Sequence, residues 1–368
     1  MNNSSVSIAR MKTKHMKTYF EQHEKVIKDA TLVILLVELA KQRGIHPDKL
    51  LKGTKLFQHD LIQTNFAISQ QQFVKLISNT IKFVNGPEIP FLLGSRLFPT
   101  QLGQIGLALS HARNLEDMLR IIKCYQSQVF PFMFLMEKNH KGRRYLIFNH
   151  AITCEGVGYH KFMCELLASV IVSAVKWRVK ALIDINIRFP YSQPDHIEQY
   201  QAYFEQAYRF SPKVNSFIAT SFIKNHFGLQ ISLAENVMTM PFTEGNQTIK
   251  RFYLNQVEQS IFSVGIIQYV YQKIDQYLVK DKEVTLEKIA LDLNVSPATL
   301  KRKLATHHTS YQNLLDLYRQ QQAIFQLTEQ GFSNEKVATA LHFSDLTNFR
   351  RSFKRWTGLT PNEIKQAL

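Results

Sequence analysis

Apolar residues recur in the same order in two stretches between residues 284 and 365. The first stretch has Ile289, Ala290, Leu293, Val295, Leu300 and Leu304, and the second has Val337, Ala338, Leu341, Phe343, Phe349 and Phe353. The first four members of the two sets are 48 residues apart, and the last two are 49 residues apart. Each set has the spacing of two short amphipathic helices joined by a turn. The pattern therefore predicts two helix-turn-helix units.

Polar residues at the expected helix ends agree with this prediction. The expected N-caps are Thr285, Ser296, Ser333 and Ser344, and the second is followed by a proline, which favours the first helical position. Asn294 and His342 occupy the two turns, where a positive φ is often required and where Asn and His are tolerated better than most residues other than Gly. Thr360-Pro361-Asn362-Glu363 is a capping box that predicts a short closing helix.

Residues from Ser310 to about Gln330 separate the two units and have the pattern of one helix. About 18 helical residues rise roughly 27 Å. That length is enough to place one helix of each unit in successive major grooves of DNA, which are about 34 Å apart.

The second helix of each unit has an outer face rich in basic and hydrogen-bonding side chains. Arg, Asn and Thr can read base edges in the major groove, whereas Lys and the amides at a helix N-terminus hold phosphates. Base contacts are expected from Ala298, Lys301, Arg302, Thr347, Asn348, Arg350 and Arg351, and phosphate contacts from Ser296, Ser344, Lys354 and Arg355. The alternative is two ordinary helical hairpins, but two copies with matched cores and basic faces favour DNA binding.

Upstream, helical and extended patterns alternate. Helices are expected from Thr31 to a C-cap at Gly44 and at 69–80, 114–125, 159–180, 195–207 and 264–278, and strands at 129–136, 145–148, 183–189 and 215–219. Residues 221–280 are expected to be mostly helical. The organisation predicted is a basic, mobile tail over 1–28, an α+β domain over 29–240, a helical connector over 241–280 and an all-α domain over 281–368. A mobile tail is preferred here to a nucleic-acid-binding arm.

The composition is that of a soluble globular protein with a basic balance. The 368 residues are 45% hydrophobic and carry a net charge of +16, which suits nucleic acid first and an acidic membrane surface second. Residues 281–368 contribute only +3 (12 basic, 9 acidic), so the total charge does not locate a DNA-binding face. The local pattern does, because no acidic residue lies between Asp292 and Asp316 or between Asp345 and Glu363.

Three cysteines without a CxxC pair suit reduced thiols in a cytoplasmic protein rather than a disulfide framework. No apolar core of a signal peptide is recognised in the first 30 residues. The longest apolar run, Leu32 to Val37, is far shorter than the roughly 20 residues that a bilayer requires. A cytoplasmic protein with no membrane partner is therefore expected.

The C-terminal segment resembles the double helix-turn-helix domain of AraC/XylS-family transcription regulators. The resemblance rests on Gly331-Phe332-Ser333, Val337-Ala338, Leu341-His-Phe343-Ser344, Phe349-Arg-Arg351, Phe353-Lys-Arg355 and Gly358-Leu-Thr-Pro361. It implies that Arg302 and Arg351 are the principal readers, that the other expected base contacts lie where the family varies its specificity, and that Arg319 has a structural role. His342 departs from the Gly usual in the family.

A second resemblance covers roughly residues 30–240. It rests on Gly53-Thr-Lys-Leu56, Ile68-Ser-Gln70, Gly94-Ser-Arg-Leu97, Leu102-Gly-Gln-Ile-Gly106, Tyr203-Phe204 and Arg209-Phe210. These look like the arabinose-binding-type N-terminal domain of one branch of that family. The resemblance implies a domain that senses a small molecule, of unknown identity, and forms a homodimer.

Two other groups of residues attract a functional interpretation. His150, Cys154, His160 and Cys164 lie within 15 residues and have the ligand types that zinc prefers, but their spacing matches no finger, and a core role is favoured. Four phenylalanines at 130, 132, 134 and 148 suit either an apolar effector pocket or, preferably, core packing. No P-loop, G-x-S-x-G or H-E-x-x-H motif occurs, so no enzyme, metal or cofactor is expected.

The sequence thus predicts a transcription regulator that binds promoter DNA, contacts RNA polymerase and responds to a small molecule, with activation the commoner mode in the family it resembles. The alternative is a ligand-binding or enzymatic protein whose basic C-terminal domain binds nucleic acid without sequence preference.

Overall fold

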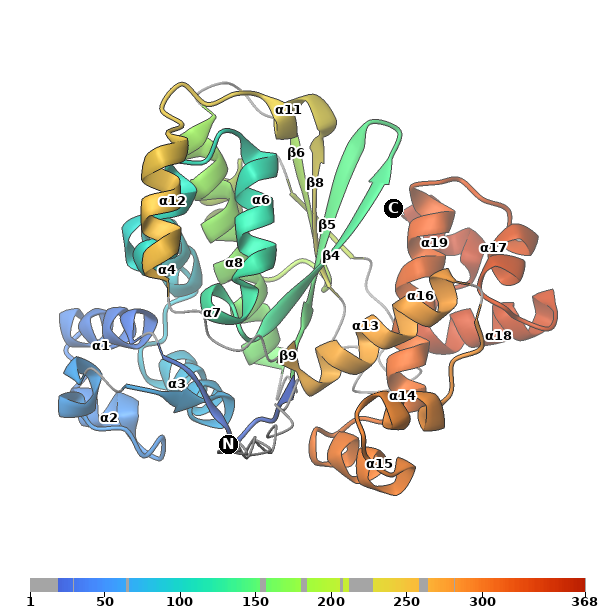
Figure 1. Ribbon diagram of the computed structural model, residues 1–368, viewed down its shortest axis with the longest axis horizontal. Coiled ribbons are helices and arrows are strands. Elements are labelled where there is room, and N and C mark those ends of the chain that lie inside the picture. The colour runs from blue at the N-terminus through green and yellow to red at the C-terminus, as the bar shows by residue number, and fades with distance from the viewer. Residues whose placement is uncertain are drawn as a thin grey trace, which may run out of the picture.

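The structure is a computed structural model that describes residues 19–28, 30–63, 66–152, 157–179, 184–205, 208–211, 228–257, 264–280 and 282–367. An α+β body contains the sheet and the helices that cover one of its faces (Figure 1). A second, helical body, formed by the C-terminal part of the chain, lies on the other side of the sheet.

Five strands form the central sheet in the order β4-β5-β8-β6-β7. Their bounds are Met133–His140 (β4), Arg143–His150 (β5), Ile185–Phe189 (β6), Tyr208–Phe210 (β7) and Leu229–Ala234 (β8). All neighbours are antiparallel except β6 and β7. The expected hairpin is present, and its two-residue turn, Lys141-Gly142, has positive φ at both positions, as a type I′ turn requires.

Helix α8 runs along the sheet and packs against α3, α4 and α9 of the α+β body (Figure 1). The segments are α1 (Thr31–Gln42), α2 (Pro47–Leu51), α3 (Gln70–Phe83), α4 (Ile89–Leu97), α5 (Gly103–Ser110), α6 (Leu115–Cys124), α7 (Gln126–Val129), α8 (Val157–Arg178), α9 (Ile197–Phe204), α11 (Glu235–Thr239) and α12 (Gln247–Gln256), with 3-10 turns η1 (Gln58–Ile62) and η2 (Thr100–Leu102). Gly94 allows α4 to approach α8 closely, because a Cβ there would lie 2.5 Å from the carbonyl oxygen of Leu166.

One stretch of α8, Gly158–Arg178, is long and apolar enough to cross a bilayer. In the fold, 78% of the most apolar 18 residues of this stretch are buried, and α8 packs against α4, α3 and the sheet. Its hydropathy is therefore accounted for by a central position in the protein core.

The C-terminal body contains seven helices among the described residues: α13 (Ile266–Val279), α14 (Leu286–Asp292), α15 (Pro297–Thr306), α16 (Tyr311–Thr328), α17 (Asn334–Ala340), α18 (Leu346–Thr357) and α19 (Pro361–Ala367). The expected connecting helix is α16, and it packs against α13, α17, α18 and α19. Ile267, Val270, Tyr271 and Ile274 of α13 share a hydrophobic core with the helix-turn-helix residues. Helix α13 is thus built into this body, although it was expected to belong to a connector over 241–280.

The described part of 221–280 is mostly helical, as predicted, in α11, α12 and α13, but it also contains the unpredicted strand β8. Leu229, Ile231 and Leu233 alternate with Gln230 and Ser232, and the strand pairs with both β5 and β6 at the centre of the sheet. The strand expected at 215–219 lies outside the described residues.

Residues 19–28 also correct the expectation of a mobile tail over 1–28, of which 1–18 lie outside the described residues. Tyr19–Phe20 (β1) pair in parallel with Val264–Gly265 (β9), and Lys25–Ile27 (β2) pair with Ile68–Ser69 (β3). Tyr19 and Phe20 are buried because they pack in the same core as α13. The overall polar composition of residues 1–28 suggested a tail, but Tyr19 and Phe20 within it are apolar and attach this segment to the core.

Candidate DNA-binding surface

The helix ends of both helix-turn-helix units are capped by side chains. Thr285 accepts from the backbone N–H of Lys288, Ser296 from that of Thr299 and Ser333 from that of Lys336. In the second unit the expected cap was wrong by one residue: Asp345, not Ser344, caps α18 and accepts from the backbone N–H of Asn348 at 2.7 Å. A carboxylate is a strong cap because it also interacts favourably with the positive end of the helix dipole.

Both turns have the backbone conformation expected from the sequence. The φ angle is +53° at Asn294 and +58° at His342. Each turn brings its second helix back onto the first, so that Leu300 and Leu304 in one unit and Phe349 and Phe353 in the other are fully buried.

The structure leaves the expected DNA-contacting residues at the surface. Ala298, Lys301, Arg302, Thr347, Asn348, Arg350 and Arg351 are all exposed, as are Ser296, Ser344, Lys354 and Arg355. Helices α15 and α18 thus turn their basic faces outward while their apolar faces form the core, as the repeat requires.

Three of the polar groups near these faces are engaged within the protein. Asn348 donates from Nδ2 to Ser344 Oγ at 2.9 Å and to Asp345 Oδ2 at 2.6 Å, so the cap fixes the orientation of a residue expected to read a base. Arg355 Nη2 lies 3.0 Å from Asp316 Oδ2 on α16, which draws part of its charge toward the body of the protein. The hydrogen bond from the backbone N–H of Asn348 helps to hold the pKa of Asp345 below its ordinary value.

Arg319 of α16 lies against the second unit, as the resemblance implied for a structural residue. Its guanidinium is 5.2 Å from the centre of the Phe343 ring, within the range of a cation–π contact. Burial lowers the pKa of Arg319. The side chain supports the turn that carries His342.

Successive side chains of β5 point to opposite faces of the sheet. The side chains on one face, those of Tyr145 and Asn149, contact the C-terminal body. Tyr145 OH donates to Glu329 Oε2 at 2.9 Å, and Asn149 is hydrogen-bonded to Gln321 of α16. Arg188 of β6 reaches the same Glu329, with Nη2 3.0 Å from Oε1. Helix α16, which joins the two helix-turn-helix units, is therefore attached directly to the sheet.

The opposite face of the same strands borders an apolar cavity of about 100 Å³. Its walls come from the strands, α6, α7, α8 and neighbouring segments: Phe98, Leu102, Leu109, Leu115, Met118, Leu119, Ile122, Gln126, Val129, Phe130, Met133, Leu135, Leu146, Phe148, Leu167, Val170, Ile171, Ala174, Val175, Leu233 and Met238. Leaving such a volume unfilled costs about 2 kcal/mol of stability. The site is therefore a candidate for a small ligand.

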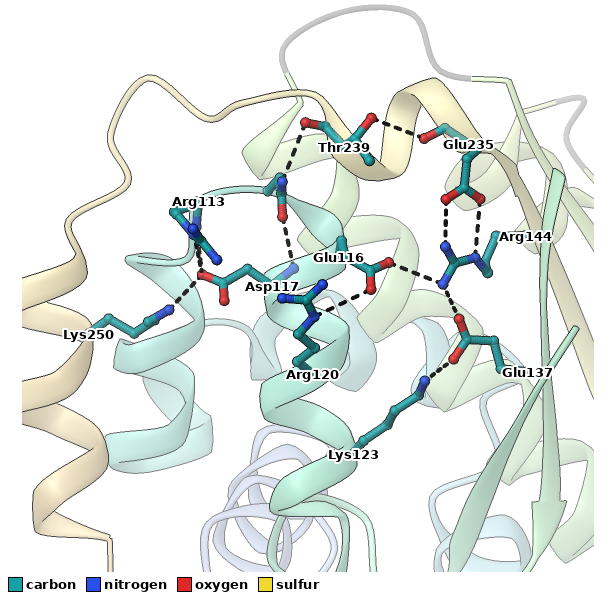
Figure 2. Close-up of polar contacts among 11 residues, drawn as sticks. Arg113, Glu116, Asp117, Arg120, Lys123, Glu137, Arg144, Glu235, Thr239 and Lys250 are labelled. Carbon is teal, nitrogen blue, oxygen red and sulfur yellow. Dashed lines mark hydrogen bonds and ion pairs between the residues drawn. The ribbon is translucent and has the colours of Figure 1, made fainter. Parts of the chain in front are cut away.

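Charged side chains fix α6, one wall of this cavity (Figure 2). Arg144 of β5 pairs with Glu116 of α6 at 3.1 Å and also with Glu137 and Glu235. Asp117 of α6 lies 2.7 Å from Lys250 Nζ of α12. Burial raises the pKa of Asp117, but hydrogen bonds from Lys250 and the Arg113 backbone outweigh it and hold the pKa below its ordinary value.

A second, more polar hollow of about 400 Å³ lies beside α3. It is lined by Gln22, Gly53, Gln70, Gln71, Val74, Lys75 and Ser78. Gln71, Lys75 and Ser78 are exposed, so this hollow opens onto the surface.

The other candidate residues of the sequence lie apart from the DNA-binding surface. His150 Nε2 is 2.8 Å from His160 Nδ1, Cys164 Sγ is 3.9 Å from the same ring, and all three are buried; Cys154 is outside the described residues. No group of three or more potential metal ligands was found among the described residues. Of the four phenylalanines, Phe130 and Phe148 border the apolar cavity, whereas Phe134 packs with Tyr271 in the other core.

Comparisons with known proteins cover both bodies. Residues 44–221 match the family described as the arabinose-binding domain of AraC transcription regulators, N-terminal, and residues 268–367 match a helix-turn-helix domain family. The chain is 23% identical over 337 residues to the ornithine utilization regulator of Pseudomonas aeruginosa, over 90% of this chain and 94% of that protein. It is 37% identical over 84 residues to the HTH-type transcriptional regulator GadX of Escherichia coli, over 23% of this chain and 31% of GadX.

A solved structure similar to the whole chain is that of the transcriptional regulator CdpR from Pseudomonas aeruginosa, with 20% identity, a TM-score of 0.44, and coverage of 92% of this chain and 98% of that one. The two matched families account for most of the sequence, and both resemblances identified from the residues are confirmed. The chain belongs to the AraC family of DNA-binding transcription regulators and has an arabinose-binding-type N-terminal domain.

Proposed function

We propose that this regulator binds promoter DNA through α15 and α18, with Arg302 and Arg351 as the principal base-reading residues. The observation that carries the proposal is the pair of capped, outward-facing helices, whose polar residues are exposed while their apolar residues form a common core. Exposed Arg and Asn side chains on a helix of this kind can reach base edges in the major groove.

The two helices present different surfaces, so the DNA site recognised by one chain is asymmetric. Helix α15 offers the small Ala298 beside Lys301 and Arg302, which leaves room for a thymine methyl group. Helix α18 offers Thr347, Asn348 and two arginines, with Asn348 already oriented by its cap.

The α+β body is the sensing part, and its ligand changes DNA affinity by favouring one arrangement of sheet and α16 over another. In the proposed function the protein acts in the cytoplasm, as a homodimer, mostly as an activator that contacts RNA polymerase. The name of one relative refers to ornithine and the description of the matched family refers to arabinose, so both molecules serve as comparators when ligands are tested.

A competition gel shift at fixed salt tests the proposal. The full-length protein is titrated onto the best duplex selected from a random pool and, separately, onto random duplex of equal length. The expected result is an affinity for the selected site about 10³-fold or more above that for random DNA. Equal affinities would instead favour the alternative, a ligand-binding or enzymatic protein whose C-terminal domain binds nucleic acid without sequence preference.

A further inference from the structure

The apolar cavity in the α+β body has a lining that selects for one chemical class. Among its 21 lining residues only Gln126 has a polar side chain, and none is charged. An ionised carboxylate or ammonium group would lose its hydration there without gaining a partner of opposite charge, which is strongly unfavourable. An uncharged molecule would instead bury apolar surface in a space that is otherwise empty.

We propose that the effector is a neutral, largely apolar molecule with at most one hydrogen-bonding group, held in this cavity with that group on Gln126. This inference rests on the proposed function, in which a small molecule controls the protein. The cavity of about 100 Å³ is smaller than the apolar cavity of about 150 Å³ that is known to accept benzene, so a one-ring ligand requires the cavity to widen. Polar effectors such as amino acids or sugars are excluded from this cavity by its chemistry.

The entrance lies at α7. Ile122, Gln126, Val129 and Phe130 are half-buried and lie close together along the chain, whereas most of the other lining residues are buried. Helix α6 is fixed by Arg144, Lys250 and Glu137, but α7 has only four residues, a single turn. The short helix is therefore the wall that gives way.

A second apolar cavity, of about 50 Å³, lies on the other side of the same wall. The two cavities share Leu102, Val129 and Phe130. Displacement of Phe130 and α7 would join them into about 150 Å³, the volume that is known to accept a single benzene ring.

Gln126 also connects the cavity to the DNA-binding body. Its Nε2 donates to the carbonyl oxygen of Met133 at 3.0 Å and to Gln268 Oε1, on α13, at 3.3 Å. Gln268 is buried, and its backbone N–H donates to the carbonyl oxygen of Ala151. A ligand that turns Gln126 away from Gln268 therefore removes a contact of α13, and α13 packs against α16, the helix that joins the two DNA-reading units.

Calorimetric titration of the full-length protein with toluene, benzyl alcohol and benzoate tests the ligand class, because these probes share a ring and differ in one group. We expect one saturable site for toluene and benzyl alcohol, with benzyl alcohol the tighter ligand, and binding of benzoate weaker by about tenfold or more. L-ornithine and L-arabinose are the polar comparators. Binding of benzoate or of either comparator with no binding of the neutral probes would overturn the proposal.

Two variants assign the site. Ala174→Leu fills the cavity and should abolish binding of both neutral probes, whereas Lys176→Leu, on the exposed side of the same helix, should not. If Ala174→Leu does not fold, Val170→Ile, which adds a single methyl group, should still weaken binding. Gln126→Met should retain toluene and lose the preference for benzyl alcohol. Unchanged binding in all three cavity variants would refute the location.

The gel shift without ligand separates this inference from the proposed function. If the protein binds the selected DNA specifically but binds none of the neutral probes, the proposed function stands and only the cavity proposal is refuted. Saturable binding of neutral probes without any preference among DNA sequences would refute the regulator and leave the cavity.

Discussion

Asn149 of β5 and Gln321 of α16 exchange two hydrogen bonds between the sheet and the helix that joins the DNA-binding units. Gln321 Nε2 donates to Asn149 Oδ1 at 2.7 Å, and Asn149 Nδ2 donates to Gln321 Oε1 at 3.3 Å. Tyr271 OH of α13 donates to the same Gln321 oxygen at 2.5 Å. Two buried amides paired in this way fix the register of the two bodies, because neither can be satisfied by an apolar neighbour.

Replacing only one member of this pair should lower the free energy of unfolding by more than half of the effect of replacing both members. Gln321→Leu leaves both Asn149 and the Tyr271 hydroxyl without their partner and should lower the free energy of unfolding by about 1–3 kcal/mol. Asn149→Leu/Gln321→Leu should be less destabilised than the sum of the single variants. Urea denaturation measures all three, with Gln312→Leu, an exposed position on the same helix, as the control. Strict additivity would show that the pair is not coupled.

Arg351 and Lys354 should affect DNA binding in different ways, although they lie on one helix. Arg351→Ala should weaken binding to the selected site by about 1–3 kcal/mol and relax the preference at one base pair. Lys354→Ala should weaken all duplexes alike and reduce the slope of log K against log salt by about one. Gel shifts on selected and single-mismatch duplexes at several salt concentrations make the comparison. Equal losses on specific and random DNA for Arg351→Ala would remove it from the base-reading set.

His342 should tolerate Gly better than Ala. Both substitutions remove the side chain, but at a φ of +58° the Cβ of Ala is strained and Gly is not. The Gly variant should therefore be the more stable by about 1 kcal/mol. Thr339, exposed near the end of α17, gives the control: there Ala should be the more stable of the two. Thermal or urea unfolding of the four proteins decides it, and the same order at both positions would contradict the argument.

Stability should fall in mild acid because of His307. This side chain is fully buried at the end of α15, and burial lowers its pKa from 6.5 to about 4, with Glu21, His23, His308 and Lys303 as its charged or titratable neighbours. Between these two pKa values the unfolded chain binds a proton that the folded protein does not, so the free energy of unfolding decreases as the pH falls. The loss between pH 7 and pH 5 should be about 2 kcal/mol.

Urea unfolding at pH 7 and pH 5 measures this loss. His307→Gln should reduce it, whereas His59→Gln, at an exposed position, should leave it unchanged. An identical pH dependence in wild type and His307→Gln would assign the acid sensitivity to other groups.

The C-terminal body could be predicted almost residue by residue because its signals are local. The caps, turns and apolar positions of each unit lie within about a dozen residues of one another, and the same pattern occurs in both copies of the repeat. One error in the helix-turn-helix units, Ser344 in place of Asp345 as the cap, arose because either residue type can cap and the two residues are adjacent. The exposure of Arg302 and Arg351 followed directly from the burial of Leu300 and Phe349.

The sheet could not be predicted in the same way. Strand β8 lies between β5 and β6, although some 40 residues of chain separate it from the nearer of them, and no local pattern encodes that pairing. Its alternation from Leu229 to Leu233 is nevertheless visible in the sequence and would have identified the strand itself. The cavity depends on how α6, α7 and α8 meet the sheet, so its existence could not be derived from periodicity.

The burial of α13 in the C-terminal core determines where this protein can be divided to make hybrids. A hybrid regulator joined at residue 281, where the helix-turn-helix repeat begins, would strip Ile267, Val270 and Tyr271 from the core and expose the groove that they fill. A junction before Ile266 would carry the helix along with its partners. Even then the transplanted part would lose Tyr19 and Phe20, because these two residues pack in the same core but come from the other end of the chain.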